Sequence, residues 1–366
     1  MTRTMAHALV EAGHQVRVIG LTPANGAACE FESDEGVPVC RLKAPKARLS
    51  WIRARYLLYR TIEIWARSGF IDLVEVPDFE GMAAGWPALC VPVVARMHGS
   101  ASYFADEMGI RLKPLTWFLE RASLQRANFC CSCSRYTADR TKRLLRLQRS
   151  EIVTLHNPIE VSPTQSQSLR VSDQVVFSGT LTPKKGVISL IRAWSMVLEK
   201  CPGAELHLFG KDGRTDDGAP MRDYLLSCVP SQGRGTVHFH GHVTLARLRT
   251  AFQSATVAVF PSYSEAFALA PMEAMAEACP TIYTRRASGK ELIDDGVNGL
   301  LVDPDDPRNI ADAIIKILKS ANMAKGLGLA GKQCVERGFS LETLLPQNVS
   351  FYLDCIRSFG QVAAKN

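Results

Sequence analysis

Short apolar runs alternate with helical patterns along nearly the whole chain, and this alternation is the feature that most constrains the fold. It is typical of parallel sheets wrapped by helices. In the first half we expect strands at residues 15–20, 72–76, 91–97, 128–132 and 151–155. In the second half we expect them at 174–178, 205–209, 237–240, 256–260, 281–283 and 299–302. Because 366 residues exceed one ordinary core, two such sheets in two domains are expected.

A polar stretch from Ser162 to Gln174, just after His156–Glu160, separates the two halves. Its composition is typical of a loop that links domains. We therefore expect an N-terminal domain over residues 1–160, a C-terminal domain over residues 161–345, and a C-terminal helix over residues 346–366 that packs back on the first domain.

Membrane and redox signals favour a cytoplasmic protein. No stretch approaches the roughly 20 uninterrupted apolar residues of a membrane-spanning helix, and the first residues lack a secretory apolar core. The 11 cysteines form an odd set without even spacing, as in a reducing compartment. Cys130, Cys131 and Cys133 form a tight group without a second ligand pair to close a tetrahedral metal site, so buried thiols are expected.

Two glutamates, Glu265 and Glu273, lie eight residues apart behind the strand expected at 256–260. A loop carboxylate just past a strand end sits where open α/β sheets bind ligands. Glu273, about two turns along the next helix, can point into the same crevice. Carboxylates in that position can accept hydrogen bonds from sugar hydroxyls. The spacing alone favours a surface acid followed by an exposed helix acid.

A glycine- and lysine-containing loop follows the strand expected at 174–178. Gly179 permits close backbone approach to a ligand, and the helix after Gly186 offers unpaired N–H groups and a positive dipole end to a diphosphate. Lys185 adds a full charge, and Gly210 ends the next strand in the same way. A solvated turn explains such a loop about as well.

Histidines stand at two strand ends. His98 follows the strand expected at 91–97, where a ligand-binding role and a structural role remain open. The acids in Val74–Gly81, at the end of another strand, are placed to meet a hydroxyl of a bound molecule. His238, His240 and His242 alternate, so a strand would send all three to one face and form a zinc site or a structural cluster.

Several of these segments resemble the retaining glycosyltransferases of family 4, which have the GT-B fold. Glu265 and Glu273, with small and apolar residues between them, match the E-x7-E signature of that family. Residues 179–186 resemble its G-R-L-x-x-x-K-G loop, although Thr180 stands where many members have arginine. Residues 286–301 resemble its G-G-x-x-E-x-x-x-x-G-x-x-G-x-L block, and the resemblance covers nearly the whole chain.

The resemblance implies two Rossmann-like domains whose parallel sheets face each other across a cleft, the first binding an acceptor and the second a nucleotide-sugar donor. It implies transfer of the sugar, with retention of configuration, to a glycan, lipid-linked or small-molecule acceptor in cell-envelope or exopolysaccharide synthesis. No cofactor or essential metal is implied. The histidine run resembles the F-x-G-x-V strand end of the family, where no member needs zinc, and this favours a structural cluster. The implied catalytic residues are Glu265, which would hold the donor sugar, His98 and Lys185. The implied donor-binding residues are Gly179, Thr180, Lys185, Gly210, Glu265, Ala266, Phe267, Ala268, Leu269 and Glu273, the last of which would bind the ribose.

The chain departs from the family pattern at two places. It begins inside a helix, Met1–Gly13, so the first strand and glycine-rich loop of the family are missing. Three explanations are open: the start codon is assigned too late, the chain is a fragment, or the protein is a degenerate copy. Ala266, Ala268 and Ala278 replace common glycines, which predicts an unusual donor preference. The alternatives are a non-catalytic GT-B subunit that acts through a partner, and a nucleotide-sugar epimerase that needs no acceptor.

A basic and aromatic segment spans residues 41–67. Its large apolar residues include Trp51, Ile52 and Tyr56. Only Glu63 opposes its eight cationic side chains, which are Arg41, Lys43, Lys46, Arg48, Arg53, Arg55, Arg60 and Arg67. Such a helix suits anionic headgroups, here at the inner face of the plasma membrane, or packs on the first domain with its arginines in water. No recognisable nucleic-acid-binding module accompanies it.

Asp303-Pro304-Asp305 precedes Pro307 and a helical pattern, so we expect these acids to cap that helix.

Overall fold

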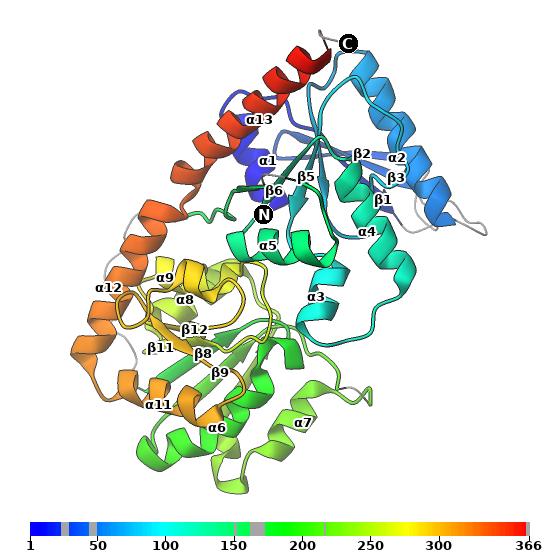
Figure 1. The fold of residues 1–366 in the computed structure, drawn as a ribbon. Helices are drawn as coiled ribbons and strands as arrows, with labels where there is room; N and C mark the ends of the chain where they lie inside the picture. The colour runs from blue at the N-terminus through cyan, green and yellow to red at the C-terminus, as the bar shows by residue number, and fades with distance from the viewer. Residues whose placement is uncertain (23–28, 44–49, 150–151, 162–172, 216, 364–366) are drawn as a thin grey trace. The chain divides into compact units, whose positions relative to one another are not determined.

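The computed structural model describes residues 1–22, 29–43, 50–149, 152–161, 173–215 and 217–363 (Figure 1). The chain forms two compact units: unit 1 comprises Met1–Pro158 and Leu341–Asn366, and unit 2 comprises Ile159–Ser340. Each is an α/β unit with parallel sheet strands, as predicted. Most of the predicted link from Ser162 to Gln174 lies outside the described residues.

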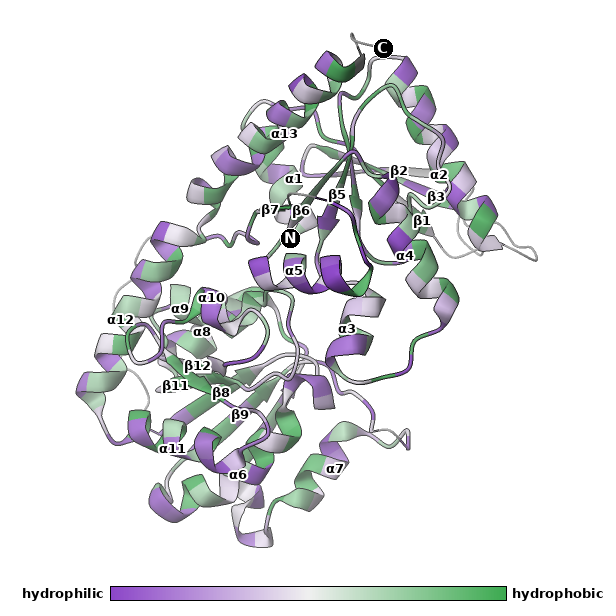
Figure 2. Cartoon of the chain, in the orientation of Figure 1, coloured by the Kyte–Doolittle hydropathy of each residue, from purple (hydrophilic) through white to green (hydrophobic). Residues whose placement is uncertain are grey.

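Unit 2 is built on one six-stranded parallel sheet with the order β10-β9-β8-β11-β12-β13. Its strands are β8 (Gln174–Ser178), β9 (Glu205–Phe209), β10 (Val237–Gly241), β11 (Val257–Phe260), β12 (Thr281–Thr284) and β13 (Leu300–Val302). The central strands are nearly continuous hydrophobic runs, as expected for a sheet covered on both faces, and Figure 2 shows the hydrophobic residues gathered along them.

Helices follow almost every strand of unit 2. They are α6 (Val187–Lys200), α7 (Met221–Cys228), α8 (Leu245–Ser254), α9 (Leu269–Ala276), α10 (Gly289–Leu292), α11 (Pro307–Leu318) and α12 (Ala321–Gly338). Two short 3₁₀ turns, η1 (Pro183–Lys185) and η2 (Ser231–Thr236), complete the unit. Trp194 of α6 is fully buried in the core, and its indole N–H donates to the Thr236 hydroxyl at 2.9 Å, which satisfies its one polar group.

Unit 1 contains two sheets among its described residues. The parallel sheet has the order β4-β5-β6-β7, with β4 (Val74–Pro77), β5 (Val93–Met97), β6 (Phe129–Ser132) and β7 (Val153–Thr154). Its helices are α1 (Thr2–Glu11), α2 (Ser50–Arg67), α3 (Ala101–Glu107), α4 (Pro114–Arg126), α5 (Arg135–Leu144) and α13 (Leu341–Ala363), the last of which contacts α1.

A second sheet of unit 1, with the order β1-β3-β2, contains two strands that we did not predict. It joins β1 (Val18–Thr22), β2 (Cys29–Asp34) and β3 (Val37–Lys43), with β2 antiparallel to β3. The turn between them places Glu35 and Gly36 at φ 49° and 88°, the left-handed pair of a tight hairpin. The sequence signal is the acidic residue followed by glycine between two runs that alternate in polarity.

The Cys130–Cys133 group is buried, as predicted. All three cysteines lie at or just after β6, and burial raises the pKa of the Cys130 thiol to about 11. The ten cysteines whose side chains the structure describes form no disulfide. These thiols therefore behave as small hydrophobic side chains.

Candidate functional site

The strand order of unit 2 creates a topological switch point between β8 and β11. From β8 the chain winds outward through β9 and β10, and it then crosses back to β11 and winds outward through β12 and β13. In open parallel sheets, ligands bind in the crevice at the carboxyl ends of the two strands where the winding reverses. The loop after β8 carries Gly179 and Lys185, and the loop after β11 carries Glu265.

The two loops meet in an ion pair between residues that the sequence singled out. Lys185 Nζ donates to Glu265 Oε1 at 2.6 Å. The side chains are 28% and 9% exposed, so the pair is largely shielded from water. A backbone hydrogen bond from Tyr263 N–H to the Lys184 carbonyl, 2.8 Å, joins the same loops. A partly buried, charge-assisted contact of this kind holds both side chains at the switch point.

Close backbone contacts require glycine at two places around this pair. A Cβ built on Gly186 would lie 1.8 Å from the Pro261 carbonyl oxygen, and one on Gly210 would lie 1.9 Å from the Gly179 carbonyl oxygen. Both residues have positive φ, 72° and 144°. These contacts bring the ends of β8, β9 and β11 together.

The amino end of α6 adds a positive field to the site. The helix begins at Val187, directly after Lys185 and Gly186, and its first turn holds no acidic residue. Gly186, the N-cap, has no side chain with which to cap the helix. The first N–H groups and the dipole of α6 therefore favour an anion, next to the Lys185 ammonium group.

The loop after β11 carries the predicted donor residues into α9. Ala266 and Phe267 are buried, and the Phe267 ring packs on Phe339 with centroids 5.4 Å apart. Ala268 is the N-cap of α9, and Leu269 is its first residue. The contact with Phe339 therefore anchors the loop after β11 at Phe267.

Glu273 lies in the second turn of α9, five residues after the N-cap. Burial raises the pKa of its carboxyl group, and the charge of Arg249 partly opposes that shift. A half-buried carboxylate is a strong acceptor for ligand hydroxyls.

A small hollow opens at the carboxyl ends of β8 and β11. Its lining residues come from both strands and their loops: Phe177, Ser178, Lys185, Phe260, Ser262, Glu265, Ala268, Ala270, Pro271 and Tyr283. The predicted residues Gly179 and Thr180 follow Ser178, and Thr180 is exposed. Gly210 follows β9, and its backbone lies against that of Gly179. Lys185, Glu265 and Ala268 thus line the hollow as a group, whereas Glu273 is not among its lining residues.

His98 belongs to unit 1 and follows β5 directly. Burial, together with the nearby Arg96 charge, lowers the pKa of its imidazole to about 4. The imidazole is therefore neutral near pH 7, a state in which it can take part in hydrogen bonds but carries no positive charge.

Two buried carboxylates hold the loop that carries His98, and both roles were missed from the sequence. Asp78 accepts the backbone N–H groups of His98 and Gly99 at 3.0 and 3.1 Å, and Glu120 accepts those of Ala101 and Ser102 at 3.0 Å each. Asp78 is fully buried, and burial raises its pKa to about 7. The expectation that Asp78 meets a bound hydroxyl is therefore wrong, since its oxygens serve the backbone.

The cap of α11 is Asp306, and not Asp303 or Asp305 as predicted. The Asp306 carboxylate accepts the N–H groups of Arg308 and Asn309. Asp303 and Asp305 both pair with Arg286, whose guanidinium lies over the ring of Tyr263. These acids fix Arg286 beside the loop after β11.

The basic segment of unit 1 is only partly available to a membrane. Arg60 and Arg67 both pair with Glu63, and Arg55 donates to the carbonyls of Trp51 and Gly81. Lys46 and Arg48 lie outside the described residues. Large side chains of α2 are nevertheless exposed, notably Trp51, Ile52, Tyr56 and Ile64. No helix in the described ranges has the length and apolarity needed to cross a bilayer, and surface contact stays a prediction.

Two family models match the chain, one in each half. The model described as "Glycosyltransferase Family 4" matches residues 1–162, and the one described as "Glycosyl transferases group 1" matches residues 172–320.

Two proteins that are similar to this chain in sequence are also named as glycosyltransferases. A glycosyltransferase of Methanocaldococcus jannaschii is 30% identical over 53% of this chain and 49% of its own length. The D-inositol 3-phosphate glycosyltransferase of Corynebacterium diphtheriae is 30% identical over 43% of this chain and 36% of its own length. The matched region thus spans about half or less of these relatives.

Solved structures share the fold over nearly the whole chain. A sucrose-phosphate synthase of Thermosynechococcus elongatus superposes with a TM-score of 0.81 at 21% identity, covering 98% of this chain and 93% of that one. HepE of Anabaena, solved with UDP and glucose, gives 0.69 at 16% identity and covers 86% of each chain.

Proposed function

Because the chain belongs to the group 1, family 4 glycosyltransferases of the GT-B fold, we propose that it transfers a sugar from a nucleotide-sugar donor to an acceptor hydroxyl. The acceptor is a glycan, a lipid-linked molecule or a small molecule, and the reaction retains the anomeric configuration. We place the activity in cell-envelope or exopolysaccharide synthesis on the cytoplasmic side, where the cysteines stay reduced.

The observation that carries this proposal is the Lys185–Glu265 pair at the switch point of unit 2. A nucleotide sugar needs a cationic partner for its diphosphate and an acceptor of hydrogen bonds for its sugar hydroxyls. Lys185 supplies the first, and the Glu265 carboxylate supplies the second at contact distance. The donor diphosphate would compete with Glu265 for the ammonium group and leave the carboxylate to the sugar.

The chemical step separates a diphosphate from the sugar, so negative charge grows on the leaving group. The amino end of α6 faces that charge in place, and Lys185 turns from Glu265 to the diphosphate when the donor binds; electrostatic stabilisation of this kind usually supplies the largest share of catalysis. The N–H groups of Gly179 and Leu181 already donate to the carbonyls of Phe209 and Lys211, so the diphosphate relies on Lys185 and the amino end of α6. Glu273 holds the ribose hydroxyls. In this account the transfer itself uses neither a cofactor nor a metal.

His98 is proposed to contact the transferred sugar. Its neutral imidazole suits a hydrogen bond to a hydroxyl. The hydrogen bond from the His98 backbone N–H to the Asp78 carboxylate holds the loop that carries it. The acceptor is assigned to unit 1, where a hollow of about 360 Å³ lies beside α3 and α4. The apolar side chains Ile110, Leu112 and Trp117 line it and favour a lipid-linked acceptor.

The nucleotide-sugar donor is also supported by the relatives. HepE holds UDP and glucose in its crystal structure, and a neighbour from Burkholderia xenovorans with a TM-score of 0.72 is by name a UDP-forming trehalose-phosphate synthase. These ligands and activities belong to those proteins. They favour UDP-sugars as the first donors to test here.

The function is tested by the product of the reaction. We expect purified protein to release a nucleoside diphosphate from one of UDP-, GDP- or ADP-glucose when a polyprenyl-linked glycan or an inositol phosphate is present, and ¹H NMR to show an α-linked product. A β-linked product would contradict retention. Conversion of the donor sugar without any acceptor would favour an epimerase, and no turnover of any donor would favour a non-catalytic subunit.

A further inference from the structure

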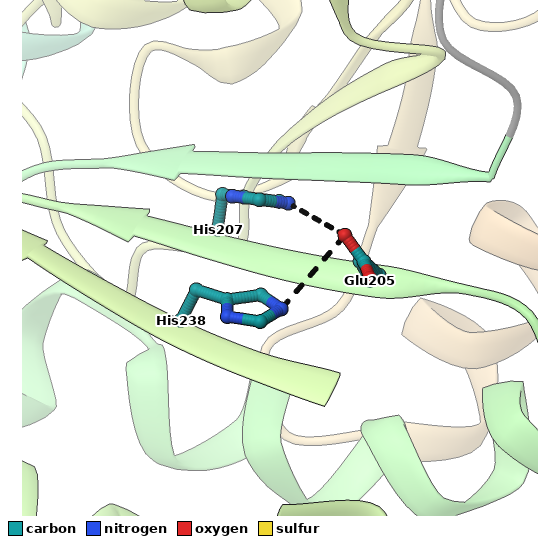
Figure 3. A group of neighbouring side chains, drawn as sticks. All are labelled: Glu205, His207 and His238. Carbon is teal, nitrogen blue, oxygen red and sulfur yellow. Dashed lines mark ion pairs between the residues drawn. The ribbon is translucent and has the colours of Figure 1, made fainter. Parts of the chain in front are cut away.

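We propose that Glu205, His207 and His238 bind a divalent transition-metal ion, with zinc as the best match, at the edge of the unit 2 sheet. The three side chains come from two neighbouring strands and point toward one another (Figure 3). None of them belongs to the residues at the β8–β11 switch point. The site is a separate feature of unit 2.

Strand register brings the three ligands together. His238 of β10 pairs directly with His207 of β9, and Glu205 lies two residues before His207, so all three share one face of the sheet. Leu206 and Leu208 point to the opposite face and into the core. This set differs from the trio of histidines that the sequence suggested, because His242 lies beyond the end of β10.

The ligand atoms are already near the spacing of a metal site. Glu205 Oε2 lies 3.4 Å from His207 Nε2 and 3.8 Å from His238 Nε2, and the three ligand atoms lie within 4.8 Å of one another. Tetrahedral zinc with bonds of about 2.0–2.1 Å separates its ligand atoms by roughly 3.3–3.4 Å. Small side-chain rotations therefore suffice to close the site.

The unsatisfied nitrogen of His238 points to a missing partner. Although 37% of the His238 side chain is exposed, its Nε2 atom is buried and has no hydrogen-bond partner among the described residues. A buried polar atom without a partner costs about 1–3 kcal/mol. A cation bound between His238 and Glu205 would satisfy this atom.

His240 orients the second imidazole for metal binding. His207 Nδ1 lies 2.9 Å from His240 Nε2, so a proton on Nδ1 leaves the lone pair of His207 Nε2 directed at Glu205. Metal-binding histidines usually donate their other N–H to such a partner. The Gln174 amide nitrogen also contacts His207 Nε2, at 3.3 Å, and must swing aside when a metal binds.

Two imidazoles and one carboxylate are a frequent zinc set that leaves a fourth position for water. Glu205 is 56% exposed, so an ion can enter from solvent. The ligands lie toward the amino ends of β9 and β10, whereas Gly210 and the switch point lie at the carboxyl ends. His207, the ligand nearest to Gly210 along β9, is three residue steps or about 10 Å from it. The ion would therefore join edge strand β10 to β9 and would not contact the donor.

The test is zinc binding to the full chain after treatment with a chelator and dialysis. Competition with a chromophoric chelator should show one tight zinc ion per chain, at least about 100-fold weaker in His238→Gln and in Glu205→Gln. His242→Gln, which changes an exposed histidine of the same segment, is the matched control and should bind like the wild type. Equal affinity in His238→Gln and the wild type would overturn the proposal, as would no binding below about 100 µM free zinc.

Cobalt substitution distinguishes this site from the cysteines. Cobalt bound by two imidazoles and a carboxylate should give weak visible bands without thiolate charge-transfer absorption near 300–350 nm. Strong thiolate absorption would assign the ion to cysteines and overturn the proposal. Because these readouts need neither donor nor acceptor, they stand whatever the outcome of the transfer assay.

Discussion

Replacing Lys185 by methionine is expected to lower the release of nucleoside diphosphate by about 10²–10³-fold, equivalent to roughly 2.7–4 kcal/mol of transition-state stabilisation. Methionine keeps the unbranched apolar stem of the side chain and removes the ammonium group. The ammonium group lies 2.6 Å from Glu265 and directly before α6, where the departing diphosphate would develop its charge. Steady-state rates with the preferred donor measure the effect.

Loss of folding must be separated from loss of function, because Lys185→Met removes the cation that contacts the largely buried Glu265 carboxylate. Lys185→Met/Glu265→Gln removes both charges and should recover thermal stability without recovering turnover. Lys316→Met, at an exposed position of α11, is the matched control and should keep the wild-type rate. A Lys185→Met enzyme within about threefold of the wild-type rate would contradict the role of Lys185.

Gly210→Ala is expected to destabilise unit 2 by about 3–5 kcal/mol through a steric clash and a disfavoured backbone conformation. The added Cβ would lie 1.9 Å from the Gly179 carbonyl oxygen and 2.6 Å from its carbon. Both atoms are backbone, so relief requires β8 and β9 to separate. For a unit of this size, we expect the midpoint of thermal unfolding to fall by roughly 6–20 °C.

Gly218→Ala is the matched control for Gly210→Ala. Gly218 also has a positive φ, 87°, but a Cβ there would meet no atom within 4 Å. Gly218→Ala should lower the free energy of unfolding by only about 1–2 kcal/mol, the cost of placing alanine at a positive φ. Equal melting temperatures for the two variants would show that the contact between Gly210 and Gly179 does not hold the strand ends together.

The hydrophobic pattern predicted unit 2 well. The runs at 174–178 and 205–209 match β8 and β9 residue for residue. β8 is a short, mostly buried apolar run, and β9 alternates its buried leucines with Glu205 and His207; each is followed by a glycine. The hairpin of β2 and β3 was missed because its strands alternate in polarity and carry charged residues, which weakens the apolar signal. Its turn of Glu35 and Gly36 was the signal that remained.

The candidate site was only partly readable from the sequence. The strand order brings Lys185 to Glu265, residues 80 positions apart, and only the spacing within each loop was visible beforehand. Asp78 was misread and Glu120 was overlooked. A buried carboxylate that accepts backbone N–H groups looks the same in sequence as an exposed acid. Glu205 joined the histidines only once the register of β9 and β10 was known.

The central claim is that the switch point of unit 2 binds the nucleotide of the donor, and calorimetric titration with UDP, GDP and ADP tests it most directly. We expect micromolar binding of one nucleotide, weakened in Glu273→Ala by about 1–3 kcal/mol, or roughly 5- to 150-fold, through the lost hydrogen bond to the ribose. Glu199→Ala, on an exposed acid near the end of α6, is the control and should bind like the wild type. Binding of none of the three nucleotides, or equal affinity in Glu273→Ala and the wild type, would contradict the account.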